Sequence, residues 1–420
     1  MVEGGATAHC LHFMICRGGG TTPSFPASGD QTLKSPTILT LTLALFIAAC
    51  GSTDEPTGPS DDDGVVDPEP EPEPEGVPIL GDGTHDVADV VITPVATAED
   101  GLDVPTALAF HPFVAGELWI TSQADDSIVI VNDVGLASRS AQKYGGPTTQ
   151  GASHFLANPS GIAFSLDNGN AATSHEEDQI TQSSTPADFM GPTLWSTDRL
   201  IFDGGHSGHL DMLHNSPNGM GIAWDSGNAF WIYDGYHSAV TRYDFADDHG
   251  PGGADHSDAV VHRCAEGAIT RQPQAPSGME MDHATGWLYI ADTGAGRIAR
   301  LDTNSGTEGG PIFPNYDATV QRYIDGAVVE TFIDTAALGG AFPSGLALRD
   351  GMIFVGDVGN GTLYAYSMET GEMVDYLPLG LANGALKGIA FDEAGSLYAV
   401  DSFANQVLKI EPSIEEAATE

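Results

Sequence analysis

Basic residues are scarce in this 420-residue chain. It contains 14 lysine and arginine residues against 59 aspartate and glutamate residues, which gives a formal net charge of −45. A field of that sign repels nucleic acid and anionic lipid headgroups, and it attracts cations. The composition therefore excludes nucleic acid as a partner. It leaves cation binding and adaptation to a saline habitat as two open explanations of the charge.

Cysteine is also rare, with four residues in the whole chain, and only Cys264 lies beyond residue 50. A framework of disulfides is therefore unavailable to the folded part of the chain. Several motifs of common enzymes are missing as well, namely G-x-S-x-G, the P-loop, C-x-x-C, H-E-x-x-H and the dinucleotide fingerprint. No short motif of the sequence therefore indicates a class of reaction.

The longest apolar run, at residues 37–49, is too short for a comfortable membrane span and follows Lys34. It suits the hydrophobic region of a signal peptide better, although a buried helix ending in cysteine is an alternative. Residues 47–50 (Ile-Ala-Ala-Cys) resemble the lipobox of bacterial lipoproteins. That resemblance implies diacylation of Cys50 and export to the periplasmic or cell-surface face of a membrane. Residues 1–32 do not fit a signal peptide, so we expect the natural start to lie further along the chain.

Proline alternates with glutamate and aspartate in residues 52–78. Such a segment cannot bury a core, and charge repulsion extends it. We therefore expect residues 1–49 to be a removed pre-sequence and residues 50–85 to be a lipidated, acidic linker. A folded domain is expected at residues 86–412, with a disordered tail at residues 413–420.

The rest of the chain is repetitive and rich in glycine, with 52 residues of that type. Short apolar strands separated by Gly, Asn, Asp and Pro turns indicate an all-β fold. In six copies a serine or aspartate ends the second strand, and a branched apolar residue follows six positions later. These pairs are Ser122 and Ile128, Ser174 and Ile180, Asp234 and Val240, Asp292 and Ile298, Asp357 and Leu363, and Asp401 and Val407. The recurring acids are interpreted as structural, bonding the backbone of the turn that follows.

The pattern P-x-G-I-A-x-D, L-Y-x-x-D and N-x-x-I resembles NHL repeats over roughly residues 86–412. The resemblance implies a six-bladed β-propeller, in which each blade is a four-stranded sheet. The last copy ends after three strands, whereas residues 90–96 form an unassigned strand before the first copy. We predict that this N-terminal strand completes the last blade and closes the ring.

In a propeller of this kind, the connection before the first strand and the connection between the second and third strands lie on one face, here called the top face. Six histidines are predicted to gather there, and imidazoles with nearby carboxylates suit zinc, copper or iron. They are His154, His175, His206, His209, His214 and His237. Solvated loop histidines are the alternative.

A second acidic segment, residues 247–258, is predicted to join the third and fourth strands of the third blade on the opposite face. Closely spaced carboxylates among glycines suit a hard cation such as calcium. The candidate ligands are Asp248, His249, Asp255, His256 and Asp258. An ordinary acidic turn explains the same residues.

Three further residues are candidates for contact with a ligand on the top face. Arg271 could hold a carboxylate, and Tyr236 and Asp234 could line the channel. The sequence thus favours a monomeric, surface-tethered binding module for an unidentified small molecule or protein, with a bound metal. The alternative is a metal-dependent lyase or hydrolase, because the resemblance extends to peptidyl-amidoglycolate lyase and to propeller lactonases.

Overall fold

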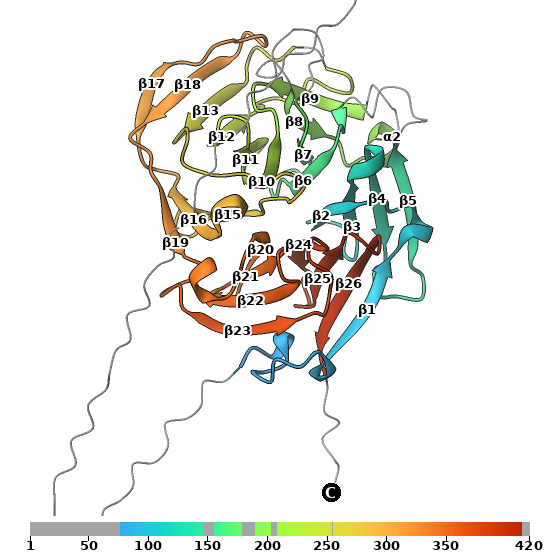
Figure 1. Cartoon of the computed structure of the whole chain (residues 1–420). Helices are drawn as coiled ribbons and strands as arrows, with labels where there is room; N and C mark the ends of the chain where they lie inside the picture. Colours follow the sequence, from blue (N-terminus) through green and yellow to red (C-terminus); the bar gives the residue numbers. More distant parts are fainter. Residues whose placement is uncertain (1–75, 147–154, 179–189, 203–207, 254, 414–420) are drawn as a thin grey trace, which may run out of the picture. The chain divides into compact units, whose positions relative to one another are not determined.

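A computed structural model of the chain describes residues 76–413, apart from residues 147–154, 179–189, 203–207 and 254. The described part consists of six sheets, almost entirely antiparallel, that follow one another around a central axis (Figure 1). Each sheet is one blade of a β-propeller, so the all-β, six-bladed fold is confirmed. No helix among the described residues is both long and apolar enough to cross a membrane.

Each blade has four strands that run outward from the channel, and the first three blades follow the chain order. The first blade contains β2 (Pro105–Phe110), β3 (Leu118–Ser122), β4 (Ser127–Asn132) and β5 (Ser140–Gly145). The second contains β6 (Pro159–Phe164), β7 (Ala171–His175), β8 (Met190–Trp195) and β9 (His209–His214), with the short helix α2 (Arg199–Phe202) before β9. The third contains β10 (Gly219–Ser226), β11 (Ala229–Asp234), β12 (Ala239–Asp244) and β13 (Val260–Cys264).

The remaining three blades depart from simple chain order in two places. The fourth blade contains β14 (Met279–Asp282), β15 (Trp287–Asp292), β16 (Arg297–Asp302) and β19 (Val329–Ile333). The fifth contains β20 (Pro343–Arg349), β21 (Met352–Asp357), β22 (Thr362–Ser367) and β23 (Met373–Pro378). The sixth contains β24 (Leu386–Phe391), β25 (Leu397–Asp401), β26 (Gln406–Pro412) and, from the start of the domain, β1 (Val90–Ala96).

β1 closes the ring, as the sequence predicted. It pairs antiparallel with β26, from Val90 opposite Pro412 to Ala96 opposite Val407 (Figure 1). Val90, Val95 and Ala96 are buried in this pairing. The last blade therefore takes its inner three strands from one end of the domain and its outer strand from the other.

Positions of the inner strand are counted here from the start of the repeat, which in the fourth blade is Pro276, three residues before β14. The third position is a glycine in five of the six blades, for example Gly221 and Gly278. A β-carbon on Gly221 would lie 1.8 Å from the carbonyl oxygen of Ser277 in the next blade. A β-carbon on Gly345 would lie 2.4 Å from the carbonyl oxygen of Lys387. The inner strands of neighbouring blades thus approach each other too closely for any side chain. This contact explains the recurring glycine of the repeat.

The second strands are buried on both faces, because each lies between two neighbouring blades. All residues of β3, β7, β11 and β25 are buried. The acids at the ends of three second strands bond the following turn as predicted. Asp234 accepts from the backbone N–H of His237, Asp357 from Gly359 and Asn360, and Asp401 from Ala404.

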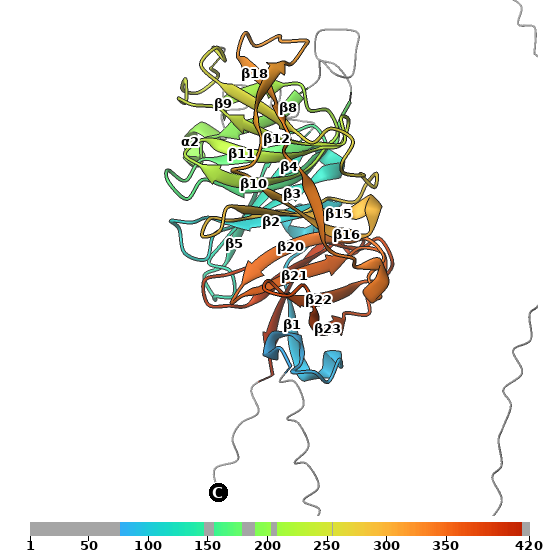
Figure 2. The same ribbon diagram turned by 90° about the vertical axis from the view of Figure 1, so that its left-hand side faces the viewer.

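Two insertions shift the strands that the repeat predicts. Ile180 lies outside the described residues, and the third strand of the second blade is β8, which begins only at Met190. Between β16 and β19 the chain inserts the hairpin β17 (Thr307–Pro311) and β18 (Val320–Asp325). β18 pairs parallel with β13, so the hairpin widens the third blade to six strands at its outer edge (Figure 2).

Packing of the domain begins before residue 86. Val77, Ile79 and Leu80 are buried against the last two blades, although the sequence analysis leaves them in the linker. The carboxylate of Asp375 in β23 accepts hydrogen bonds from the backbone N–H groups of Val77 and Gly83, at 2.7 Å and 3.0 Å. This buried acid ties the N-terminal segment to the outer strand of the fifth blade.

Candidate functional site

The strand register fixes which side chains share a face of the propeller. The start of β2 lies opposite the end of β3, with Pro105 beside Ser122, and the same arrangement recurs in the other blades. The connections before the first strand and between the second and third strands therefore meet on the top face. The other two connections lie on the opposite face, here called the bottom face.

Among the predicted top-face histidines, His154 and His206 lie outside the described residues. His175 ends β7 but is 1% exposed. Its two ring nitrogens lie 3.0 Å from the hydroxyl of Thr173 and 3.2 Å from the carbonyl oxygen of Gly191. His175 is thus held inside the second blade.

His209 is not on the top face, which corrects its predicted position. It begins β9, the outer strand of the second blade, and pairs with Trp195 at the bottom end of that sheet. His214 ends the same strand at the top. Because a six-residue strand is ~17–20 Å long, the two imidazoles lie at opposite ends of the blade. The sequence pattern predicts a connection into the third blade at these residues, whereas the structure has a strand.

His214 and His237 do lie at the top, but each faces a carboxylate of its own. The Nδ1 atom of His214 is 2.6 Å from Asp317, which the inserted segment before β18 supplies. The Nδ1 atom of His237 is 2.9 Å from Asp234. Among the residues that the structure describes, no three His, Cys, Asp or Glu side chains lie close enough to share a metal ion. The described histidines therefore do not fit the transition-metal site that the sequence suggested.

The acidic segment at residues 247–258 joins β12 to β13 on the bottom face, as predicted. Its two histidines face different partners. Nε2 of His249 is 2.8 Å from Asp258, whereas Nδ1 of His256 contacts the buried Asp211 of β9. The hydrogen bond that each histidine donates to its neighbouring carboxylate raises the pKa of that histidine.

The remaining candidates for a cation ligand in that segment do not converge either. Asp255 accepts two hydrogen bonds from Ser257, through its backbone N–H and its hydroxyl, and Asp248 is exposed. The described part of this loop thus has the contacts of an acidic turn and lacks the convergent oxygens of a calcium site.

Asp234, which we expected to contact a ligand, is completely buried. Its carboxylate accepts hydrogen bonds from Ser216 and His237 and lies 3.4 Å from Nε of Arg263. Burial alone would raise the pKa of Asp234, but the hydrogen bonds from His237 and the charge of Arg263 outweigh it and lower this pKa. Asp234 therefore orders the top of the third blade. Tyr236, by contrast, is 46% exposed and packs edge-on against His237.

Arg271 lies at the mouth of the central channel on the top face, where it meets Glu176. Nη1 of Arg271 is 3.4 Å from a carboxylate oxygen of Glu176. The same carboxylate accepts a hydrogen bond from the backbone N–H of Gln274 at 2.8 Å and one from the side chain of Gln123 at 3.4 Å. Glu176 thus links the first, second and fourth blades at the channel mouth.

A cavity of about 530 Å³ opens beside this network. It spans residues of the first, fourth, fifth and sixth blades, and a cavity of that volume suits a small organic ligand. Its polar lining is Gln123, Gln272, Gln274, Asn383 and Lys387, and its large apolar lining is Val104, Phe342, Val358 and Phe403.

Lys387 is the unusual residue of this cavity. It is 4% exposed, and its amine has no hydrogen bond or ion pair with any described residue. Burial lowers the pKa of the Lys387 amine to about 8, and the negative charge of Glu176 offsets part of this effect. A buried amine with these properties can pair with an anion that enters the cavity.

The repeat itself contains the signal that could have identified Lys387. It occupies the second position of its inner strand, where four other blades carry a hydroxyl. These residues are Thr106, Ser160, Ser277 and Ser344, and three of them donate to a backbone carbonyl of a neighbouring blade. The recurring hydroxyl side chains stabilise the contacts between blades. The lysine occurs in one copy only, so these contacts do not require it, and it can bind a ligand.

No family model matches the sequence, and no curated protein matches it either. Solved structures do match. A structural genomics protein of unknown function from Bacteroides thetaiotaomicron is 10% identical, with 77% of this chain and 76% of that chain covered and a TM-score of 0.50. This likeness concerns the propeller fold alone.

Two further structures are similar at lower TM-scores. An auxiliary nutrient binding protein from Bacteroides ovatus is 14% identical over 77% of each chain, with a TM-score of 0.48. Virginiamycin B lyase from Staphylococcus aureus is 14% identical, with 77% of this chain and 100% of that chain covered and a TM-score of 0.43.

Proposed function

We propose that this protein binds a small organic anion in the cavity at the top mouth of its channel, with the Lys387 amine pairing with the anionic group. The observation that carries the proposal is the buried amine itself. In a chain with a net charge of −45, a lysine that no described carboxylate pairs directly is a rare feature.

The charges around the cavity favour a monoanion. Lys387 and Arg271 are cationic and Glu176 is anionic, so the three groups leave one positive charge for a ligand to neutralise. The amides of Gln123, Gln274 and Asn383 supply hydrogen-bond donors and acceptors that fix the orientation of a polar group.

The apolar part of the same lining suits an apolar body. Phe342, Val358 and Phe403 line it, and Phe403 is 64% exposed. Covering such a ring removes apolar surface from water at about 25 cal/mol per Å². An aromatic or branched aliphatic carboxylate therefore matches both halves of the cavity.

Thermal denaturation with phenylacetate, compared with the uncharged phenylethanol and the cationic phenylethylamine, tests this proposal. We expect phenylacetate to raise the melting temperature at pH 7 more than phenylethanol does, because a ligand of the native state stabilises it by mass action. Among the three compounds, only the rise with phenylacetate should depend on Lys387. Lys387→Met should abolish that rise, since it keeps the length of the side chain and removes its charge. Lys409→Met, on the outer part of the sixth blade where Lys409 pairs with Glu411, is the matched control.

The pH dependence gives a second readout. An anion requires the protonated amine, so its affinity should fall by about tenfold per pH unit above the Lys387 pKa of about 8. Equal stabilisation by phenylacetate in the wild-type protein and in Lys387→Met would refute the proposal.

We also propose that the chain is exported and lipid-anchored through Cys50, which lies outside the described residues. The lipobox-like residues 47–50 and the acidic linker support this location. Metabolic labelling with an alkyne fatty acid in a bacterial host should label the wild-type chain and Cys16→Ser but not Cys50→Ser. Label on Cys50→Ser would contradict the anchor.

A further inference from the structure

The bottom half of the channel contains one residue that breaks the repeat. At the fifth position of the inner-strand repeat, counted in the fourth blade from Pro276, five blades carry an alanine and the fourth blade carries Glu280. The alanines are Ala109, Ala163, Ala223, Ala347 and Ala390, and all line the same space. The small side chains of five blades thus leave room around one carboxyl group.

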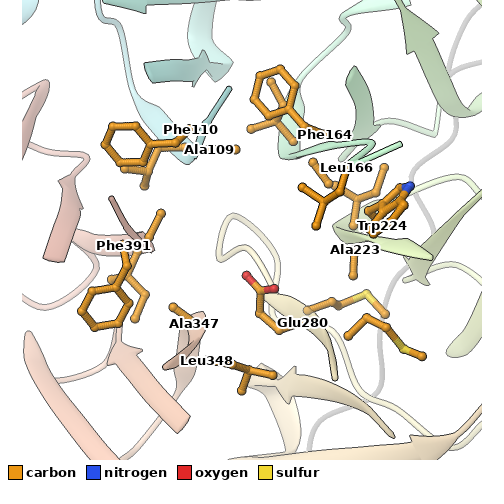
Figure 3. A pocket seen from close by; sticks show the side chains of 18 of the residues that line it. Ala109, Phe110, Phe164, Leu166, Ala223, Trp224, Glu280, Ala347, Leu348 and Phe391 are labelled. Carbon is orange, nitrogen blue, oxygen red and sulfur yellow. The ribbon is translucent and has the colours of Figure 1, made fainter. Parts of the chain in front are cut away.

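That space is a funnel of about 320 Å³ on the bottom face, lined by the inner strands of all six blades. The next position of each strand carries a large apolar residue. Four of these are aromatic, namely Phe110, Phe164, Trp224 and Phe391, and the others are Met281 and Leu348. Figure 3 shows the Glu280 side chain extending from β14 toward the middle of the funnel, between these residues.

Glu280 also lines the narrow space of about 60 Å³ that continues the channel upward. Its side chain therefore lies where the funnel meets this narrow space, and it is partly exposed. It has no hydrogen bond or ion pair with any described residue. Burial raises the pKa of Glu280 to about 8, and no neighbouring charge contributes to the shift.

One other titratable residue lines the funnel within the described part of the chain. His283 lies at the rim, exposed, and its ring packs at 4.7 Å from that of Trp224. Neither the funnel nor the narrow space above it is lined by a lysine or an arginine of the described residues. The described lining of these two spaces therefore supplies no countercharge for an ionised Glu280 carboxylate.

Such an environment is complementary to a cation with apolar substituents. A carboxylate in apolar surroundings is costly unless it is paired, and aromatic faces attract cations through their quadrupole. The negative field of the whole molecule also raises the local concentration of cations. A hydrated metal ion gains little here, because Glu280 offers a single carboxyl group and the aromatic side chains offer no oxygen ligands.

We propose that the funnel binds an organic ammonium ion, whose charge pairs with the Glu280 carboxylate and whose apolar groups contact the ring of aromatic side chains. This site lies at the opposite end of the channel from Lys387 and selects ligands of the opposite sign. It does not depend on the function proposed for the top cavity.

Isothermal titration calorimetry with phenyltrimethylammonium tests the site on the purified chain. The uncharged tert-butylbenzene has the same shape and serves as the comparison ligand. We expect the wild-type protein to bind the cation at pH 9 at least tenfold more tightly than tert-butylbenzene. Because the cation requires the ionised carboxylate, its affinity should fall about 100-fold from pH 9 to pH 6.

Three variants identify the group responsible. Glu280→Gln should lose the preference for the cation and most of the pH dependence. His283→Gln should keep the preference for the cation and the part of the pH dependence that comes from Glu280. This variant thus distinguishes the effect of Glu280 from the effect of a charge change at the rim. Glu393→Gln removes an exposed carboxylate from the same face and should bind as the wild type does.

The proposal is overturned if the cation does not bind at pH 9, if tert-butylbenzene binds as tightly, or if Glu280→Gln retains the affinity and pH profile of the wild type. Circular dichroism of each variant confirms that it is folded. Lys387→Met provides the last check, since it should leave cation binding unchanged even if the top cavity proves to have another role.

Discussion

Lys387 and Glu280 belong to the inner strands of two different blades, with Lys387 in the cavity at the top of the channel and Glu280 in the funnel at the bottom. Both replace a small residue that recurs in the other blades, and both titrate with a pKa of about 8 because of burial. Burial acts in opposite directions on the two groups, since it disfavours the charged form of each. Among the described residues, each of these two repeat positions thus carries an ionisable side chain in one blade only, where the repeat does not require one.

Glu280 should make stability depend on pH. Its pKa is raised from 4.5 to about 8 in the folded protein, so between these values the folded state binds a proton that the unfolded state has lost. The contribution of Glu280 to the free energy of unfolding is fully present below pH 4.5. It falls by about 1.4 kcal/mol per pH unit as the pH rises toward 8.

Chemical denaturation at pH 5 and at pH 8.5 checks this expectation. The free energy of unfolding of Glu280→Gln, relative to that of the wild type, should be a few kcal/mol more favourable at pH 8.5 than at pH 5. Glu393→Gln, which is exposed, should show no such change. An unchanged difference between the two pH values would show that Glu280 titrates normally in the folded state.

At the scale of elements, the ends of the domain are joined by β1. The strand pairs with β26 over its whole length and so removes two open sheet edges. Just before it, the segment at residues 77–80 packs against the last two blades. The sequence predicted this closure because its last repeat lacks one strand and an unassigned strand precedes the first repeat.

Removal of β1 should therefore unfold the propeller. A chain beginning at residue 97 loses, besides Ala96, five larger buried apolar side chains, namely Val77, Ile79, Leu80, Val90 and Val95. At roughly 1.5–3 kcal/mol each, the loss approaches the total stability of a typical domain. We expect no cooperative thermal transition for this chain, as measured by circular dichroism.

A chain beginning at residue 76 is the control for that truncation. It lacks the first 75 residues and keeps β1, so its melting temperature should match that of the full chain. Cooperative melting of the shorter chain within a few degrees of the control would show that three strands suffice for the last blade.

For the whole molecule, the dominant property is the net charge of −45. Like charges on a compact surface repel one another, and this repulsion lowers the stability of the folded state. Added salt shortens the range of the repulsion, from about 30 Å at 0.01 M to about 10 Å at 0.1 M.

The melting temperature should accordingly rise by several degrees between 0.01 M and 0.3 M NaCl. Caesium chloride at the same ionic strength should have the same effect, because screening depends on charge and concentration. A rise that occurs with one cation and not with the other would instead indicate a specific cation site.

The repeated residues determined the fold. Glycine at the third position of the inner strands, an acid at the end of the second strands and a branched residue six positions later are local requirements of every blade, and they recur where Gly221, Asp357 and Leu363 lie. Such requirements can be predicted because the same backbone geometry imposes the same residue each time. The predicted pairing of residues 90–96 with the last repeat followed from this periodicity together with the four-stranded blade that the resemblance to NHL repeats implies.

The candidate site depended on the tertiary structure. The histidines were predicted to share a rim, but His209 starts a strand at the bottom, His175 is enclosed in its blade, and His214 faces an aspartate from an insertion about a hundred residues away. Spacing along the chain does not reveal which insertion reaches which loop. The physical reason is that the direction of a side chain and its neighbours arise from packing between blades, whereas strand periodicity is a property of each blade alone.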